Sequence, residues 1–219
     1  MTRAVKRRRY TSPLREDQAR STSKAIVDAA VALFSAKGYA AVSLDAVAEE
    51  ARVSRATVFT SVGGKPELLR AAFRAAFGRA AGAEDVPMPL VERPRSREVR
   101  ARPTAAGYLD GYAELCTSLH SHMARVYEAI REGSRADPAV NALWIEINEE
   151  RRRGAATIVA DVKARAALRP GLDEKDAADV VWVLNDPVHF TMLVHGCGWT
   201  EEKFQKWLAR ALALELLVH

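Results

Sequence analysis

The stretch from Ser43 to Lys65 reads SLDAVAEEARVSRATVFTSVGGK and holds two short helical patterns joined by a tight turn. The apolar residues of its first half recur at helix spacing and are Leu44, Val47, Ala48 and Ala51. The second half carries Val58 and Val62 four positions apart, on one helix face. Ser43 and Ser54 precede the two patterns, where a side-chain oxygen can cap the first turn of a helix. The stretch therefore predicts a helix-turn-helix.

The predicted turn is Arg52-Val53, with Val53 pointing back between the two helices. Two helices that cross steeply over a short turn need a small side chain at their closest approach, and Ala48 supplies it. The side chains left on the outer surface are short, polar and partly cationic, and they are Ser54, Arg55, Ala56, Thr57 and Thr60. Such a surface can lie in the major groove of DNA and meet phosphates and base edges.

Residues 24–77 resemble the DNA-binding domain of the TetR family of transcriptional regulators. The resemblance runs through KAIVDAAVALFSAKGYAAVSL and AVAEEARVSRATVF to a lysine and an apolar helix at KPELL. Three helices and their junctions match in order, which is more specific than a helix-turn-helix alone. The resemblance implies operator DNA as the partner, and we expect these residues to contact it: Ser43, Arg52, Ser54, Arg55, Ala56, Thr57, Phe59, Thr60 and Lys65.

The chain departs from the family pattern at four places. Arg52 stands where the family usually has glycine, so a left-handed turn would cost about 1 kcal/mol, while the arginine offers a phosphate contact. Phe59 replaces the usual tyrosine and removes a phenol that could bond a phosphate. Val62 replaces an aromatic residue, and Gly63-Gly64 loosens the link to the next helix. We therefore expect base reading to differ from the family average.

Charge is distributed unevenly along the 219 residues, although the net charge is only +5. Residues 1–82 hold 15 Lys and Arg against 7 Asp and Glu, and residues 83–219 hold 18 against 21. The first third is therefore the part expected to face a polyanion.

Residues 1–21 form a basic segment with few large apolar side chains, so we expect a disordered arm. Its cations are Arg3, Lys6, Arg7, Arg8, Arg9, Arg15 and Arg20. Two interpretations remain open: a solvated tail, or an arm that follows DNA phosphates or enters a minor groove.

The pattern divides the rest of the chain into a DNA-binding domain at 22–82, a linker or loop at 83–104 and a C-terminal domain at 105–219. Ile26 opens the apolar face of the first helix, which Lys37-Gly38 end. Pro66 suits the first turn of the helix after Lys65. The linker is assigned because prolines interrupt every helical pattern there, at Pro87, Pro89, Pro94 and Pro103.

The C-terminal domain reads as helices throughout, so the predicted fold class is all-α. Helical spacing covers 108–130, and Asp137-Pro138 open a helix that continues to about Leu168. Asp173 opens the next helix, which Pro187 should kink, and Thr200 opens the last one. Because the last helix is apolar on more than one side, the last two helices are expected to form a homodimer interface. A two-fold dimer would place two recognition helices about 34–36 Å apart on a near-palindromic operator.

Polar and aromatic residues stand on helix faces otherwise suited to a core. They are Tyr112, Cys116, Trp144, Trp182, Asn185 and His189. Ordinary core packing accounts for each of them taken singly. The family resemblance implies a small-molecule effector within this bundle, and Asn185 and His189 flank the expected kink. We therefore predict an effector site there, and a repressor that the effector releases from its operator.

Other functional classes find less support in the chain. None of the five histidines has Glu three residues before it, as a helical di-iron site would need, and no phosphate-binding loop or nucleophile motif is present. We therefore expect no enzyme activity, no cofactor and no metal. Cys116 and Cys197 are expected as reduced thiols of a cytoplasmic protein, and no segment is apolar enough for a membrane. A constitutive architectural DNA-binding protein and a helical small-molecule carrier or enzyme remain the alternatives.

Overall fold

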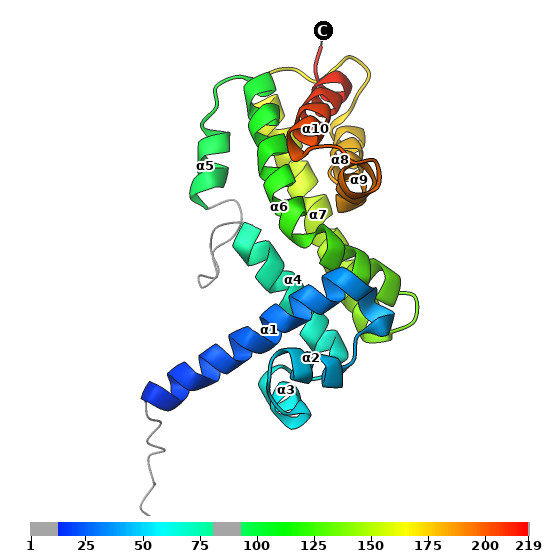
Figure 1. Ribbon diagram of the computed structural model, residues 1–219. Helices are drawn as coiled ribbons and strands as arrows, with labels where there is room; N and C mark the ends of the chain where they lie inside the picture. Colours follow the sequence, from blue (N-terminus) through cyan, green and yellow to red (C-terminus); the bar gives the residue numbers. More distant parts are fainter. Residues whose placement is uncertain (1–12, 81–92, 219) are drawn as a thin grey trace, which may run out of the picture.

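The computed structural model describes residues 13–80 and 93–218, and helices make up its regular structure (Figure 1). The elements are α1 (Pro13–Ala41), α2 (Leu44–Glu50), α3 (Arg55–Val62), α4 (Lys65–Ala80), α5 (Pro94–Arg100), α6 (Ala105–Gly133), α7 (Pro138–Lys163), α8 (Glu174–Leu184), α9 (Pro187–Phe190), the π-helical segment η2 (Thr191–Gly196) and α10 (Glu201–Leu216). Within this part of the chain, extended pairing is limited to one bridge between Leu168 and Leu217. The predicted all-α fold is confirmed.

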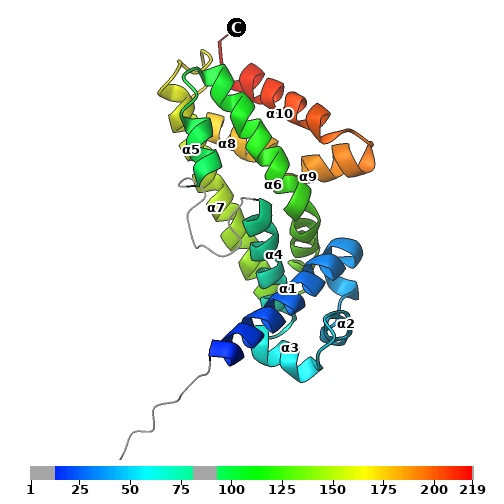
Figure 2. The same ribbon diagram turned by 60° about the vertical axis from the view of Figure 1, so that its left-hand side comes forward.

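Helices α1 to α4 form a head at one end of an elongated molecule, and α5 to α10 form the body (Figures 1 and 2). Ser43 and Ser54 cap α2 and α3 as predicted, each accepting a bond from a backbone amide in the first helical turn. Val47, Ala48 and Val58 are buried between the helices of the head. The helix-turn-helix is therefore formed by local capping together with a small apolar core.

The basic segment is helical for nearly half of its length, because α1 begins at Pro13. The prediction of a disordered arm over 1–21 was therefore wrong for residues 13–21, while residues 1–12 lie outside the described residues. Proline is favoured in the first helical turn, and the following residues are mostly good helix formers. An ion pair three residues apart, Asp17 with Arg20, adds support along the helix surface.

The predicted end of the first helix at Gly38 appears as a sharp break within α1. Gly38 has φ 72° and ψ 179°, which only glycine adopts without strain. A β-carbon there would stand 2.8 Å from a carboxylate oxygen of Glu132, but that flexible side chain could move, so the backbone conformation is what favours glycine. The break lets residues 39–41 turn away from the main axis of α1 toward α6.

A short helix, α5, occupies part of the segment predicted as a linker at 83–104. Pro94 stands in the first turn of α5, where its missing amide costs no hydrogen bond, and Pro103 follows the end of the helix. The prolines therefore delimit a helix instead of excluding one, and the loop prediction was wrong for residues 94–100. Residues 83–92 lie outside the described part.

Pro187 ends a helix and starts another, where a kink was predicted. Helix α8 stops at Leu184, and the Oδ1 of Asp186 accepts the amide of Val188 at 2.9 Å as the N-cap of α9. Proline in the first turn after a capping aspartate is a helix start, which is the same arrangement as at Asp137-Pro138. The chain therefore turns a corner between α8 and α9.

Two apolar cores lie along the molecule, and α6 and α7 pass through both. The first core joins α1 to α4 with the stretch Met123–Ile130 of α6 and the start of α7 at Val140–Ile147. The second joins the earlier part of α6 and the later part of α7 to α5, α8 and α10. The head is thus packed on the lower ends of two long helices that continue into the body. None of the described helices has the length and apolar character needed to cross a membrane.

A hydrogen bond fastens the head to the turn between α6 and α7. The Tyr39 hydroxyl donates to Asp137 Oδ2 at 2.6 Å, while Oδ1 of the same carboxylate caps α7 by accepting from Ala139. The Tyr39 ring lies so close to Gly133 that a β-carbon there would come within 2.7 Å of it. The bond from Tyr39 lowers the pKa of Asp137, and burial together with this carboxylate raises the pKa of Tyr39.

We predict that Tyr39→Phe lowers the free energy of unfolding by about 1 kcal/mol at pH 7, because Asp137 loses a donor. A carboxylate with a lowered folded-state pKa stabilises the fold above its ordinary pKa and loses that contribution as the pH falls. The difference between Tyr39→Phe and the parent should therefore shrink in acid, as measured by denaturant unfolding at several pH values. The same substitution in an Asp137→Asn background should show no such pH dependence; an identical pH dependence in both backgrounds would contradict the assignment.

Candidate nucleic-acid interface and ligand cluster

The outer surface of α3 is open to solvent at the end of the molecule farthest from α10 (Figure 2). The Arg55 side chain is 65% exposed, and Ala56, Phe59 and Thr60 are exposed with it. Val58 points the other way and is buried in the head. The body therefore leaves the predicted recognition surface accessible to a duplex.

Two of the predicted contact residues have structural duties within the head. The Ser43 hydroxyl accepts the amide of Ala46 at 3.1 Å, and the Ser54 hydroxyl accepts the amide of Thr57 at 3.0 Å. The Ser54 and Thr57 hydroxyls also lie 2.8 Å apart. These hydroxyls satisfy helix-end amides, so removing them would damage the helix starts as well as any contact with phosphate.

The predicted cations surround α3 in three different settings. Arg52 is exposed in the turn and has φ 55°, the left-handed conformation expected if the turn keeps the family geometry. Arg55 donates to Asp45 at 3.0 Å, across the two helices. Lys65 lies with its ammonium 4.2 Å from the Tyr39 ring centre and donates to the Ala40 carbonyl, and burial lowers its pKa. Asp45 was not predicted as a partner of Arg55, because only folding brings the two together.

A second candidate site is built around Arg151 of α7, at the level where the two cores meet. Its guanidinium pairs with Asp186 at 3.0 Å and is 12% exposed. It also donates to the carbonyl oxygens of Trp182 and Asn185 at 2.9 and 3.1 Å, which lie at the end of α8. One side chain thus neutralises the cap of α9 and satisfies the last carbonyls of α8.

Four of the predicted ligand residues gather near this guanidinium. Asn185 Nδ2 donates to the Tyr112 hydroxyl at 2.7 Å, and Tyr112 interacts with the buried thiol of Cys116 one turn later on α6. The Trp182 ring centre lies 5.5 Å from the Arg151 guanidinium. Burial raises the pKa of Cys116 to about 12, so its thiol is protonated and acts as a neutral polar group. With Arg151 and His120, these residues are called the polar cluster below.

Three polar atoms of the cluster have no hydrogen-bond partner among the described residues: His120 Nδ1, Trp182 Nε1 and Asn185 Oδ1. His120 is only 4% exposed and packs against the edges or faces of Phe190 and Phe204, with ring centres 6.1 and 6.2 Å away. Burial, assisted by the positive charge of Arg151, lowers its pKa to about 3 and keeps the ring neutral. Buried polar atoms without partners are uncommon in folded proteins and mark places where a ligand or water can bind.

The other two predicted ligand residues lie apart from these atoms. Trp144 packs on the Tyr127 ring at 5.1 Å between centres and belongs to the core shared with the head. His189 places Nε2 3.0 Å from the Val183 carbonyl and its ring against Trp207. Each side chain therefore has a structural role, and His189 adjoins the cluster only through its proximity to His120.

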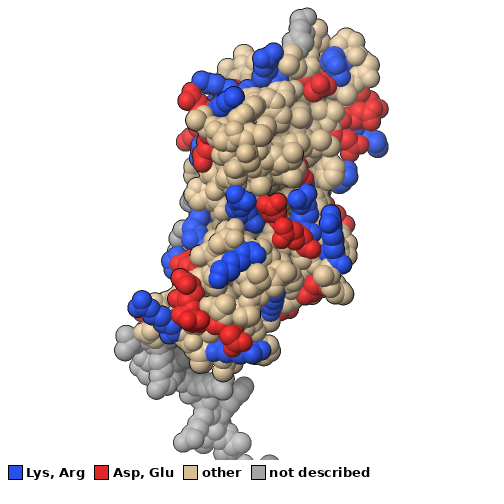
Figure 3. Space-filling view, turned by 45° about the vertical axis from the view of Figure 1, so that its right-hand side comes forward, with Lys and Arg blue, Asp and Glu red and all other residues tan. Residues whose placement is uncertain are grey.

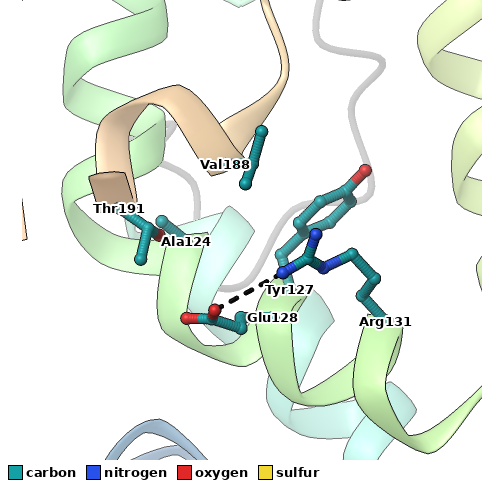
Figure 4. Close-up of a pocket in the computed structure, with 6 residues that line it drawn as sticks. All are labelled: Ala124, Tyr127, Glu128, Arg131, Val188 and Thr191. Atoms are coloured by element: carbon teal, nitrogen blue, oxygen red, sulfur yellow. Dashed lines mark ion pairs between the residues drawn. The ribbon is translucent and has the colours of Figure 1, made fainter. Parts of the chain in front are cut away.

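A small hollow between α6 and α9 is separate from the predicted ligand residues (Figure 4). It is lined by Ala124, Tyr127, Glu128, Arg131, Val188 and Thr191. Arg131 pairs with Glu128 at 3.6 Å, one turn apart on the α6 wall of the hollow. Its paired charges leave little to bind a ligand, so the polar cluster is the better candidate.

Sequence reasoning missed two members of the cluster, Arg151 and His120. Arg151 supplies its positive charge, and His120 supplies a buried ring nitrogen. Arg151 stands in the run Glu149–Arg153, where nothing marks one charged residue as inward-facing. His120 follows Tyr112 and Cys116 at four-residue intervals on α6, and that spacing is the one signal that could have found it.

Comparison with known proteins finds a family model that matches part of the head. Residues 26–72 match the model of bacterial regulatory proteins of the tetR family. A comparison with curated proteins finds no match.

Solved structures share the fold over nearly the whole chain. A candidate transcriptional regulator from Saccharomonospora viridis, in complex with choline, has a TM-score of 0.70 at 17% identity and covers 91% of this chain and 100% of its own. NalD, the secondary repressor of the MexAB-OprM multidrug efflux pump in Pseudomonas aeruginosa, has 0.63 at 16%, covering 91% and 98%. The fatty acid degradation regulator FadR from Bacillus halodurans has 0.64 at 14%, covering 93% and 96%.

At these identities the neighbours establish the fold alone, which extends from the head through α10. The matched residues 26–72 contain the helix-turn-helix and its exposed α3. Residues 26–72 therefore resemble the DNA-binding domain of bacterial regulatory proteins of the tetR family, and the chain shares its fold with solved transcriptional regulators.

Proposed function

We propose that this regulator is a homodimeric repressor, which binds a near-palindromic operator through α3 and leaves it when a small molecule binds the polar cluster. The observation that carries the DNA-binding part is the exposed α3 at the tip of a head matched by the family model. Arg52 and Arg55 border that helix and supply the phosphate-facing charge. The expected DNA-contacting residues and the division of the chain into a head at 22–82 and a body at 105–219 are part of this proposal.

The dimer interface is placed on α8, η2 and α10. Large apolar side chains are exposed on each of these elements: Val183, Met192 and Leu214. Figure 3 shows a wide area of the upper body without charged side chains at its centre, on the side where these elements lie. Exposed apolar surface of this kind is typical of a subunit interface.

The polar cluster suits an uncharged effector. Its cation, Arg151, is already paired with Asp186, and His120 is neutral. A charged ligand would therefore be buried without a counter-charge, which is costly. A neutral molecule can instead donate to Asn185 Oδ1 and accept from Trp182 Nε1, the two atoms that lack partners. NalD is a repressor and the other neighbour binds choline, so the two support a repressor and a small ligand; choline is a cation, and the neutral class rests on the polar cluster alone.

Arg52→Ala tests the interface with DNA. Alanine keeps the left-handed turn, so the stability of the head should stay within about 0.5 kcal/mol. We expect weaker binding to all sequences and a salt dependence of log K that falls by about 0.9 for each lost phosphate contact. The operator is first selected from fragmented source DNA, and affinities are then measured at several salt concentrations.

Lys163→Ala, at the far end of α7, is the matched control and should leave the slope unchanged. Enrichment of one or a few palindromic sites supports a regulator. Uniform coverage of the fragments would instead favour an architectural protein, and no binding at low salt would leave a carrier or enzyme.

Leu214→Glu tests the dimer. Leu214 is 43% exposed on α10. A carboxylate at this position would lose its hydration when the interface forms, which disfavours the dimer. We expect monomers in sedimentation at micromolar concentration, with operator affinity reduced at least tenfold. Ile145→Glu is the control, because Ile145 is similarly exposed at 49% but lies on α7. A dimeric Leu214→Glu protein would place the interface elsewhere.

A matched series of benzamide, benzoate and benzamidine tests the class of effector, because the three share a shape and differ in charge. We expect benzamide to quench tryptophan fluorescence at lower concentration than either charged analogue. Asn185→Leu should weaken benzamide binding about fivefold, since a bond to a neutral group contributes about 1 kcal/mol, while operator affinity without ligand stays unchanged. Tighter binding of a charged analogue would reject the neutral class.

A further inference from the structure

The centre of the exposed surface of α3 is apolar. Ala56, Phe59 and Thr60 share one side of the helix, at spacings of three and four residues. Phe59 is 61% exposed, the largest exposed fraction among the large apolar side chains of the described residues. An aromatic ring so exposed on the head is available for contact with a partner outside the chain.

The hydroxyl groups around this ring are turned inward. Thr60 Oγ1 donates to the Ala56 carbonyl at 2.9 Å, so the hydroxyl of this exposed residue is used within the helix and its methyl group is the part left for a partner. The Thr57 hydroxyl is occupied by Ser54 at 2.8 Å. The middle of α3 therefore offers carbon atoms to a partner, and few free donors or acceptors.

The guanidinium of Arg55, which borders this surface, is bonded to a residue of α2. Arg55 Nη1 bonds Asp45 Oδ2 at 3.0 Å, which directs the guanidinium toward α2. Its remaining N–H groups can still meet a phosphate at the edge of the groove. The charge therefore borders the apolar surface without crossing it.

Among the base edges exposed in the major groove, thymine alone carries a methyl group, and apolar side chains recognise it by contact. We propose that α3 reads its operator through thymine methyl groups, with Phe59, Ala56 and the methyl group of Thr60 forming the contact surface. This inference rests on the proposed function, since it requires α3 to lie in the major groove. It predicts half-sites with thymine beneath these three side chains.

Replacing thymine with deoxyuridine tests the idea, because it removes the methyl group and keeps every hydrogen-bonding atom. In the selected operator each thymine is replaced in turn, and the affinity of the full-length protein is measured. A buried methyl group contributes about 0.8 kcal/mol, so we expect roughly fourfold weaker binding at each contacted position. Replacements outside the half-sites serve as controls and should have no effect.

Two variants of Thr60 separate reading by a methyl group from reading by a hydroxyl group. Thr60→Val keeps the methyl group and should bind within about twofold of the parent, whereas Thr60→Ser keeps the hydroxyl group and should bind roughly fourfold more weakly. Thr60 is exposed, and thermal unfolding is used to check that each variant is folded. The opposite order would overturn the proposal.

Phe59→Ala completes a double-mutant cycle with the DNA. The variant should weaken operator binding, and the deoxyuridine replacement beneath residue 59 should then cause no further loss. If Phe59→Ala weakens binding while every thymine replacement is silent, the ring contacts deoxyribose and the proposal fails. Failure to select any preferred sequence would instead reject the proposed function itself, so the two outcomes are distinguishable.

Discussion

A buried guanidinium must be neutralised and hydrogen-bonded, and Arg151 meets this requirement by holding together three helices of the body. Removing one partner of such a pair typically costs 3–5 kcal/mol, because the other charge stays buried. Asp186 can pair with Arg151 only because the chain leaves α8 at Asn185 and starts α9 at Pro187. The corner that replaces the expected kink is therefore a condition of the ion pair, and Arg151 donates hydrogen bonds to the carbonyl oxygens that the corner leaves free.

Helix α7, which carries Arg151, also contacts the head. Helix α7 begins at Asp137, which Tyr39 bonds, and carries Glu146, which pairs with Arg70 of α4. Arg151 follows on α7, beside the unpartnered atoms of the polar cluster. A ligand that changes the position of α7 near Arg151 would thus act on contacts that fix the tilt of the head. Such coupling needs two discrete arrangements of α7, which both the ligand and the operator would have to distinguish.

Features set by neighbouring residues were predictable from the chain. Ser43, Ser54, Asp137, Asp173 and Thr200 all cap helices as expected, because a cap and its amides lie within three residues of each other. The partners of Tyr39 and Arg151 were not predictable, since they lie 98 and 35 residues away along the chain. The proline-rich segment misled for a different reason: proline disrupts the interior of a helix but favours its first turn, and spacing alone does not distinguish the two.

The departures from the family pattern change the chemistry of the head more than its shape. Arg52 adopts the left-handed conformation that the turn requires, at a cost of about 1 kcal/mol relative to glycine. The turn keeps its geometry because Val53 donates to the Ala48 carbonyl at 2.9 Å and both helices are capped. The backbone of the recognition helix is thus insensitive to these substitutions, whereas its surface is not. In the proposed complex with DNA, an additional cation at Arg52 would strengthen attraction to any sequence, and a phenyl ring at Phe59 in place of a phenol would favour apolar groups of the bases over phosphate.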